Sequence, residues 1–250
     1  MKPKAVILAA GKGTRMGSLT QDIPKPMLEV HGKPILLHIV EGMKSAGVTD
    51  FVIITGYKAE VIENYFGDGS SFGIHVDYAR QEVQDGTGKA PELAKQSLAG
   101  APFLLTYGDI MVDSSTYQSL MDSYGTGNWN ALVTAKAGEE VQKGGILLAD
   151  ADMRLTGLVE KPSQDQLDQL ISSGQLNADG PFYYNAGVYL FSNNVFDHTA
   201  TLEKSPRGEY ELTDAILGLV NSGEKVGIIE ISDQWVDVRD PEVLESLHND

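Results

Sequence analysis

The feature that most constrains this chain is a short apolar stretch that runs directly into a glycine-rich loop near the N-terminus. Residues 5–10 are apolar, and Gly11 and Gly13 follow at once, a pattern typical of a buried strand that ends in a tight turn. Glycine lacks a Cβ, so both glycines let backbone N–H groups approach phosphate oxygens closely. Arg15 and Lys25 add fixed positive charge behind the loop. These residues predict a strand and loop that bind a nucleoside triphosphate.

Two better-known phosphate-binding loops do not match this segment. A Walker loop places Gly-Lys-Ser/Thr after four intervening residues, whereas here Lys12 stands directly between two glycines. A dinucleotide fingerprint would need glycine at position 16, which is Met16. The expected second strand, 51–55, continues into Gly56 instead of an acidic residue that would hold a ribose. An NAD-type oxidoreductase is therefore a disfavoured alternative. Quenching of the protein's fluorescence by NADH would support it.

Short apolar segments alternate with amphipathic ones in the first half of the chain. This alternation predicts βαβ units and an α/β fold whose mostly parallel sheet has helices on both faces. After residue 128, strands follow one another with little helix between them, as in an extension of the sheet. Stretches such as 123–128 read as surface connections. The expected strands are 4–10, 50–55, 74–79, 102–107, 130–135, 144–149, 154–160, 183–191 and 225–231, and the expected helices are 33–46, 58–65, 88–98, 210–222 and one that starts at Pro241.

The composition is that of an acidic chain with one sizeable core. The 250 residues are 42% hydrophobic and carry a net charge of −16, which argues against a nucleic-acid partner because such binding needs clustered basic residues. Anionic substrates must then rely on local cations and a metal ion. The sequence has no cysteine, and no segment reads as a signal peptide or a membrane span. We therefore expect a cytoplasmic protein that does not bind membranes.

Further motifs follow in order along the chain, and together they resemble those of one enzyme family. Segment 8–36 is close to L-A-A-G-x-G-T-R-L followed by P-K-P-M-L-P-V-x-G-K-P, and its departures at Met16 and Glu29 leave the charged residues unchanged. The later motifs are Gln81 with Gly86-Thr87-Gly88, Gly108-Asp109, Gly145, Glu160-Lys161-Pro162, 185–189, 208–214 and 235–238. Over nearly its whole length the chain resembles the sugar-1-phosphate nucleotidyltransferases, the family of glucose-1-phosphate thymidylyltransferases and N-acetylglucosamine-1-phosphate uridylyltransferases.

The resemblance implies a fold and a reaction. Residues 1–250 would form a single nucleotidyltransferase domain with a Rossmann-like fold, in which a mixed, mostly parallel sheet carries a β extension for the sugar. A nucleoside triphosphate and a sugar 1-phosphate would give a nucleoside diphosphate sugar and pyrophosphate, in one Mg²⁺-dependent in-line displacement. The sequence does not identify the sugar or the oligomeric state.

For the nucleotide, the resemblance implies a surface formed by the N-terminal loop and a second loop after residue 80. A glutamine amide both donates and accepts, so Gln81 can pair with N3–H and a carbonyl of uracil or thymine, although it can flip and so does not by itself exclude cytosine. A backbone N–H from Gly86 suits the O4 carbonyl and opposes an amino group. We therefore expect UTP or dTTP. The implied nucleotide-binding residues are Leu8, Ala10, Gly11, Gly13, Thr14, Arg15, Gln81, Gly86 and Thr87.

A metal site is expected at the end of a buried strand. Asp109 places a carboxylate there, where an unpaired charge costs free energy, and Mg²⁺ typically takes one or two carboxylates plus water and phosphate oxygens. The resemblance implies Asp237 as the second metal ligand. It also implies Arg15, Lys25 and Asp109 as the catalytic residues, with Arg15 on the leaving pyrophosphate and Lys25 between the α-phosphate and the incoming phosphate.

For the acceptor, the resemblance implies residues at strand ends in the second half of the chain. Glu160 can accept hydrogen bonds from two sugar hydroxyls, and Lys161 can hold the sugar phosphate as a point charge. Gly145 would allow close backbone approach, Asn185 would bond to the sugar, and Arg207 would contact the phosphate.

One departure from the family pattern keeps another interpretation open. The family usually has Gly-Thr after W-x-D-V, where this chain has Arg239-Asp240. A regulatory or sugar-nucleotide-sensing protein of the same fold with weak turnover is therefore an alternative, against which the intact Arg15, Lys25 and Asp109 argue. A member of the family that uses CTP or GTP is a further alternative.

Overall fold

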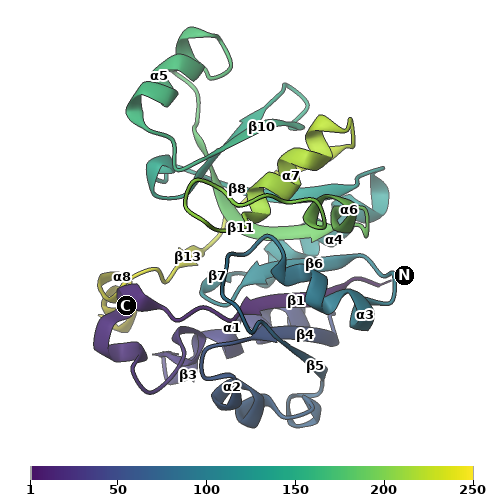
Figure 1. Ribbon diagram of the computed structural model, residues 1–250, viewed down its shortest axis with the longest axis vertical. Helices are drawn as coiled ribbons and strands as arrows, with labels where there is room; N and C mark the ends of the chain where they lie inside the picture. The colour runs from purple at the N-terminus through teal and green to yellow at the C-terminus, as the bar shows by residue number, and fades with distance from the viewer. Residues whose placement is uncertain (1, 250) are drawn as a thin grey trace.

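The computed structural model describes residues 2–249, within which the largest sheet has nine strands (Figure 1). The strand order is β10-β9-β11-β6-β1-β4-β5, and β8 pairs with both β11 and β12. The nine strands are β1 (Lys4–Ala9), β4 (Asp50–Thr55), β5 (His75–Arg80), β6 (Phe103–Tyr107), β8 (Ala131–Ala137), β9 (Gly145–Ala149), β10 (Leu155–Glu160), β11 (Tyr183–Phe191) and β12 (Val226–Glu230).

The first half of the sheet is parallel, as the alternation of apolar and amphipathic segments predicts. β1 pairs in parallel with β4 and with β6, and β4 pairs in parallel with β5. The chain therefore moves outward from β1 to β5 and then returns to the other side of β1. Open α/β sheets bind ligands at such a reversal, at the carboxyl ends of the strands. The loop after β1 and Asp109 after β6 both lie at this edge.

The second half of the sheet is organised by β11. This strand is antiparallel to β6, β8 and β9, and β9 is antiparallel to β10, while β12 adds to β8 in parallel. Antiparallel pairing brings the start of β11 and the end of β10 to the carboxyl end of β6. Gly145 and Glu160, which are direct partners in the register, thus gather near Asn185.

Helices cover both faces of the sheet, which has a hydrophobic core on each side. Along β1, Ala5 and Ile7 belong to the core under α1, α2, α4 and α8, whereas Val6 faces the core under α3, α6 and α7, the pattern of a strand buried on both faces. No helix within residues 2–249 has the length and apolar character needed to cross a bilayer. The helices are α1 (Ile35–Ser45), α2 (Ala59–Phe66), α3 (Lys95–Leu98), α4 (Ser114–Thr126), α5 (Gln164–Ser172), α6 (Val195–Thr199), α7 (Leu212–Asn221) and α8 (Pro241–Asn249), with 3₁₀ helices at Thr14–Thr20, Lys25–Met27, Ser70–Phe72, Ala90–Ala94 and Val141–Lys143.

Two small ribbons complete the fold. β2 (Glu29–Val30) pairs with β3 (Lys33–Pro34), and β7 (Ile110–Val112) pairs with β13 (Trp235–Asp237). In the second ribbon Asp237 lies opposite Ile110, and the Val238 N–H donates to the carbonyl of Asp109 at 2.9 Å. The ribbon therefore carries a residue from near the end of the sequence to the tip of β6.

The structure contains elements that were not expected, namely α4, α5, α6 and the short strands β2, β3, β7 and β13. α5 lies where strands were expected to follow one another, and Leu167 is its buried residue. α4 extends through Thr126 into a stretch expected to be a connection, and its buried residues are Thr116, Tyr117 and Leu120. The helix expected over 88–98 is a 3₁₀ helix, with Pro91 in its first turn, followed by the single α turn of α3.

Candidate active site

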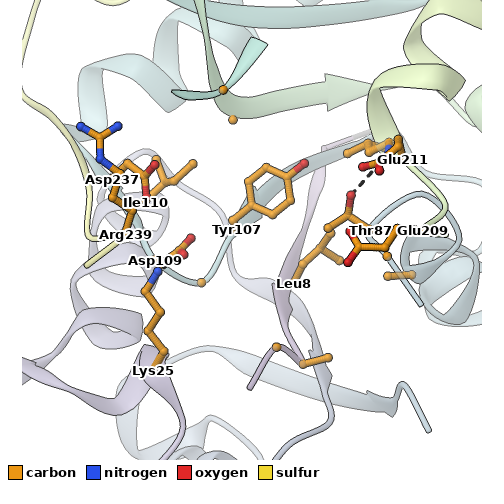
Figure 2. A pocket seen from close by; sticks show the side chains of 18 of the residues that line it. Leu8, Lys25, Thr87, Tyr107, Asp109, Ile110, Glu209, Glu211, Asp237 and Arg239 are labelled. Carbon is orange, nitrogen blue, oxygen red and sulfur yellow. Dashed lines mark hydrogen bonds and ion pairs between the residues drawn. The ribbon is translucent and has the colours of Figure 1, made fainter. Parts of the chain in front are cut away.

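A cleft of about 910 Å³ opens at the carboxyl edge of β1 and β6. Figure 2 shows Lys25 and Asp109 at one end of it, Leu8 and Thr87 at the other, and Tyr107 between them. Every residue that the sequence analysis assigns to the nucleotide, the metal or the acceptor lines this cleft. The fold thus brings these residues around one space, while their individual roles remain predictions.

The loop after β1 depends on its two glycines in different ways. Gly13 has φ 60° and ψ 39°, a left-handed conformation, and a Cβ there would lie 2.8 Å from Cβ of Lys25. A Cβ on Gly11 would meet nothing within 4 Å. Gly13 is therefore required by the packing of Lys25, whereas Gly11 leaves the backbone open toward the cleft. Arg15 follows in the 3₁₀ helix and is exposed.

Lys25 and Asp109 form the shortest charge contact in the cleft. Nζ of Lys25 lies 2.6 Å from Oδ2 of Asp109, and the lysine is only 9% exposed. The segment that carries it packs tightly on the tip of β6, because a Cβ on Gly108 would lie 3.0 Å from Cγ of Pro26. The Gly108 N–H also donates to the carbonyl of Leu8 at 2.9 Å. Close packing of the Pro-Lys-Pro segment thus directs Lys25 to Asp109.

Asp237 supplies a second carboxylate beside Asp109. Burial raises the pKa of Asp237 to about 6, the negative charge of Asp109 adds to the shift, and Lys25, Arg239 and Arg15 oppose it. Two like charges held together favour a bound cation. Among residues 2–249 there is no cluster of three or more His, Asp or Glu side chains for a metal. A pair of carboxylates nevertheless fits Mg²⁺, which keeps several waters and binds substrate phosphates.

The second loop fixes the orientation of the Gln81 amide. Its Nε2 donates to the carbonyl of Gly86 at 2.9 Å. A carbonyl oxygen only accepts, so this bond assigns the nitrogen to the loop and leaves Oε1 as the acceptor that Gln81 can offer to a base.

Loop 81–88 is joined to a segment from the far end of the chain. The Tyr210 N–H donates to the carbonyl of Asp85 at 2.8 Å, and the Gly88 N–H donates to the carbonyl of Tyr210 at 2.8 Å. Gly86 has φ 118°, and a Cβ there would overlap the Tyr210 backbone. Oγ1 of Thr87 accepts from the backbone N–H of the first residue of α7 at 3.4 Å. The two segments therefore form one wall of the cleft.

The residues predicted to bind the acceptor also line the cleft. A Cβ on Gly145 would lie 3.2 Å from Oε2 of Glu160. Burial raises the pKa of Glu160, and the charges of Arg207 and Lys161 oppose that shift. Nη2 of Arg207 lies 2.9 Å from Oε1 of Glu211 and 3.5 Å from Oε1 of Glu160. Lys161 has φ 46° and directs its backbone N–H to the carbonyl of the residue before Gly145.

Asn185 is oriented by a neighbouring tyrosine. Its Oδ1 accepts a hydrogen bond from the Tyr189 hydroxyl at 3.0 Å. Since the carbonyl oxygen is used in this way, the amide N–H groups are what Asn185 can offer to a sugar hydroxyl.

Comparison with known proteins identifies the family. The sequence pattern of the nucleotidyl transferase family matches residues 4–250. The chain belongs to this family. Its fold is also that of a solved UDP-glucose pyrophosphorylase in complex with UDP-glucose, with a TM-score of 0.84, coverage of 100% of this chain and 98% of that one, and 21% identity.

Two relatives differ in the share of their own length that this chain matches. A bifunctional protein GlmU from Methanococcus maripaludis is 35% identical over 245 residues, which are 98% of this chain and 53% of GlmU. The UTP–glucose-1-phosphate uridylyltransferase AglF from Haloferax volcanii is 30% identical over 240 residues, which are 96% of this chain and 92% of AglF. This chain thus spans about half the length of the GlmU protein but nearly all of AglF.

Residues to which the sequence analysis assigned no role also line the cleft of this nucleotidyl transferase, among them Tyr107, Glu211 and Arg239. Tyr107 lies at its centre, and burial raises the pKa of its hydroxyl. Glu211 is 8% exposed and accepts from the Ser205 hydroxyl at 2.9 Å. Arg239 lines the metal end. The signals were present, since Tyr107 precedes Gly-Asp, Glu211 lies in the 208–214 motif, and Arg239 departs from the family pattern.

Proposed function

We propose that this nucleotidyl transferase joins a nucleotidyl group from UTP or dTTP to a sugar 1-phosphate and releases pyrophosphate. The observation that carries the proposal is that the phosphate loop and the acceptor residues face one cleft, with Asp109 and Asp237 between them. AglF, whose name states that it uses UTP and glucose 1-phosphate, matches this chain over nearly the whole length of both. We further propose that residues 1–250 act as one nucleotidyltransferase domain in the cytoplasm, where nucleoside triphosphates are available.

The reaction is a single in-line displacement. An oxygen of the sugar 1-phosphate forms a bond to the α-phosphorus, the bond from the α-phosphorus to the bridging oxygen breaks, and pyrophosphate leaves with that electron pair. The attacking phosphate is already anionic at neutral pH, so no general base is required. Catalysis then depends on positioning and on stabilising the developing charge.

The charged residues divide this work between them. Arg15 and the backbone amides of the loop at Gly11 hold the β- and γ-phosphates and stabilise the leaving pyrophosphate. Lys25, which is fixed at 2.6 Å from Asp109, reduces repulsion between the α-phosphate and the incoming phosphate. Mg²⁺ held by Asp109 and Asp237 would supply further charge stabilisation at the phosphates.

The acceptor residues hold the sugar and its phosphate. Glu160 accepts from sugar hydroxyls, Asn185 donates to the sugar, and Gly145 lets the backbone come close. Lys161 and Arg207 neutralise the acceptor phosphate before it attacks.

The orientation of Gln81 favours uracil or thymine over cytosine. With Nε2 bonded to the Gly86 carbonyl, Oε1 is presented as an acceptor. Uracil and thymine carry a hydrogen on N3 that can donate to it, whereas cytosine N3 is itself an acceptor and would repel it. A site built to hydrogen-bond one base rejects another by leaving its own groups unpaired.

A matrix of substrates tests the proposal. Pyrophosphate release should be measured for UTP, dTTP, CTP, GTP and ATP, each with a panel of hexose 1-phosphates and Mg²⁺. We expect UTP or dTTP to be preferred, with at least one sugar 1-phosphate required. Asp109→Asn should lose more than about tenfold in rate, because a lost charge contact costs at least ~2 kcal/mol in the barrier, and its melting curve checks that it folds.

The same matrix contains the results that would contradict the proposal. Preference for GTP or ATP would overturn the role of Gln81 and Gly86. No release with any pair would favour a sensing protein of this fold, although the intact contact between Lys25 and Asp109 argues against that alternative.

A further inference from the structure

Arg239 lines the cleft at the end opposite Thr87 (Figure 2). Its backbone N–H donates to the carbonyl of Asp237 at 2.8 Å. This i to i+2 hydrogen bond makes Val238, which is fully buried, the centre of a tight γ-turn. Asp237 and Arg239, on either side of the turn, both line the cleft.

The guanidinium of Arg239 is held only loosely by the neighbouring carboxylate. Its Nε lies 3.9 Å from Oδ2 of Asp240, beyond hydrogen-bonding range. Asp240 already uses Oδ1 to accept from the N–H of Val243 at 3.0 Å, in the first turn of α8. Lys25, by contrast, lies 2.6 Å from its carboxylate partner. The guanidinium of Arg239 carries five N–H donors. Because Arg239 lines the cleft, these donors can bind an anion there.

The strand that leads to Arg239 is fastened to the acceptor side of the cleft. Trp235 of β13 donates its indole N–H to the carbonyl of Ala186 at 2.8 Å, its ring lies edge-on to that of Tyr184 at 5.4 Å, and Tyr184 and Arg239 both line the cleft. Tyr184 directly precedes Asn185 in β11, and a Cβ on Gly144 would overlap its ring. Arg239 is thus close both to the carboxylate pair and to the wall predicted to hold the sugar.

We propose that Arg239 is a further substrate-binding residue, which contacts the phosphate of the acceptor beside the site of transfer. The inference rests on the function proposed above. A planar guanidinium binds phosphate through two parallel hydrogen bonds. Lys161 and Arg207 neutralise the acceptor phosphate from the sugar side, and Arg239 adds a cation on the side of Asp237. The net charge of −16 does not favour the binding of anionic substrates. A local cation such as Arg239 therefore reduces the repulsion between the acceptor phosphate and the α-phosphate of the nucleotide.

Three variants of the full chain test this role. Arg239→Ala removes the guanidinium, Arg239→Lys keeps the charge without its planar geometry, and Arg154→Ala removes an exposed arginine outside the cleft as a control with the same charge change. The measurements are kcat and KM for each substrate in turn, with melting curves. For Arg239→Ala we expect kcat/KM for the sugar 1-phosphate to fall about 10- to 100-fold, as loss of a hydrogen bond to a charged group implies.

The other kinetic constants distinguish a role of Arg239 in binding the acceptor from a role in binding the nucleotide. We expect KM for the nucleoside triphosphate to stay within about twofold, Arg239→Lys to recover part of the loss, and Arg154→Ala to match wild type. An equal or larger rise in the nucleotide KM would move Arg239 to the donor, and unchanged constants would remove it from the site. Absence of turnover in wild type would instead overturn the proposed function itself.

Discussion

Lys25 reaches Asp109 because Gly13 has no side chain. A Cβ on Gly13 would lie 2.8 Å from Cβ of Lys25. Gly73 is also left-handed, with φ 66° and ψ 37°, but a Cβ there would lie nearest to Nζ at the flexible end of Lys44, at 3.1 Å. The two glycines therefore separate the strain of a left-handed backbone from the displacement of Lys25.

Replacing each glycine by alanine tests this distinction. Both Gly13→Ala and Gly73→Ala should lose about 1–2 kcal/mol of stability, the cost of alanine in a left-handed conformation. Only Gly13→Ala should also lose more than about tenfold in turnover, because Lys25 must move away from the reacting phosphates. Melting curves and pyrophosphate release measure the two effects, and equal turnover in both variants would remove Lys25 from the reaction.

Asp237 makes stability depend on pH. Its pKa is 3.8 in an unperturbed chain and about 6 here, so between these values the folded protein binds more protons than the unfolded one. The free energy of unfolding therefore falls as the pH rises through this window. In EDTA, Asp237→Asn should remove that loss and raise stability by up to about 3 kcal/mol at pH 7, with little gain at pH 4.

Thermal melts of the Asp237→Asn variant across pH 4 to 7 check this expectation. The exposed Asp152→Asn is the matched control, with the same change of charge outside the cleft. A gain that does not vary with pH would mean that burial of the Asp237 carboxylate is not its cause.

At the scale of elements, loop 81–88 and the segment 205–211 depend on each other. The backbone hydrogen bonds at Tyr210 hold the loop that carries Gln81, and the same segment carries Arg207 across to Glu160. The wall predicted to bind the nucleotide and Arg207, predicted to bind the acceptor, are thus parts of one unit.

Gly86→Ala should disrupt that unit. The added Cβ would overlap the Tyr210 backbone, so the loop must shift and take Gln81 with it. We expect the KM for the preferred nucleotide to rise about tenfold, the effect of one lost hydrogen-bonded pair. Gly174→Ala, also at positive φ but with nothing within 4 Å, is the control for backbone strain alone. Matching KM values in the two variants would mean that the loop does not read the base.

Sequence patterns predicted the elements with long apolar segments, such as β1 and α1, and missed shorter or more polar ones, such as α4, α5 and α6. β1 and α1 have long apolar periodicity, whereas α5 buries Leu167 and begins with a capping box formed by Ser163 and Gln166, a local signal that the strand-rich context obscured. The site residues were readable as motifs because they are contiguous in the sequence. The bond from Gln81 to Gly86 and the position of Arg239 in the cleft could not be predicted, since they depend on tertiary packing.

At the scale of the whole molecule, the sheet topology places the residues predicted to bind the nucleotide and those predicted to bind the sugar 1-phosphate on two sides of Asp109. The reversal of strand order between β1 and β6 places the phosphate loop on one side of Asp109, and antiparallel β11 places Asn185 on the other. The β7-β13 ribbon then adds Asp237 beside Asp109, at the boundary between the two halves. The proposed function requires that the phosphorus transferred is the one next to the nucleoside.

Tracing which phosphorus is transferred tests this account most directly. The enzyme should be incubated with Mg²⁺, a sugar 1-phosphate and the preferred nucleotide, labelled with radioactive phosphorus at either the α or the γ position. We predict that α label appears in the sugar nucleotide and γ label in pyrophosphate. Appearance of γ label in the sugar product would show phosphoryl transfer and contradict the account.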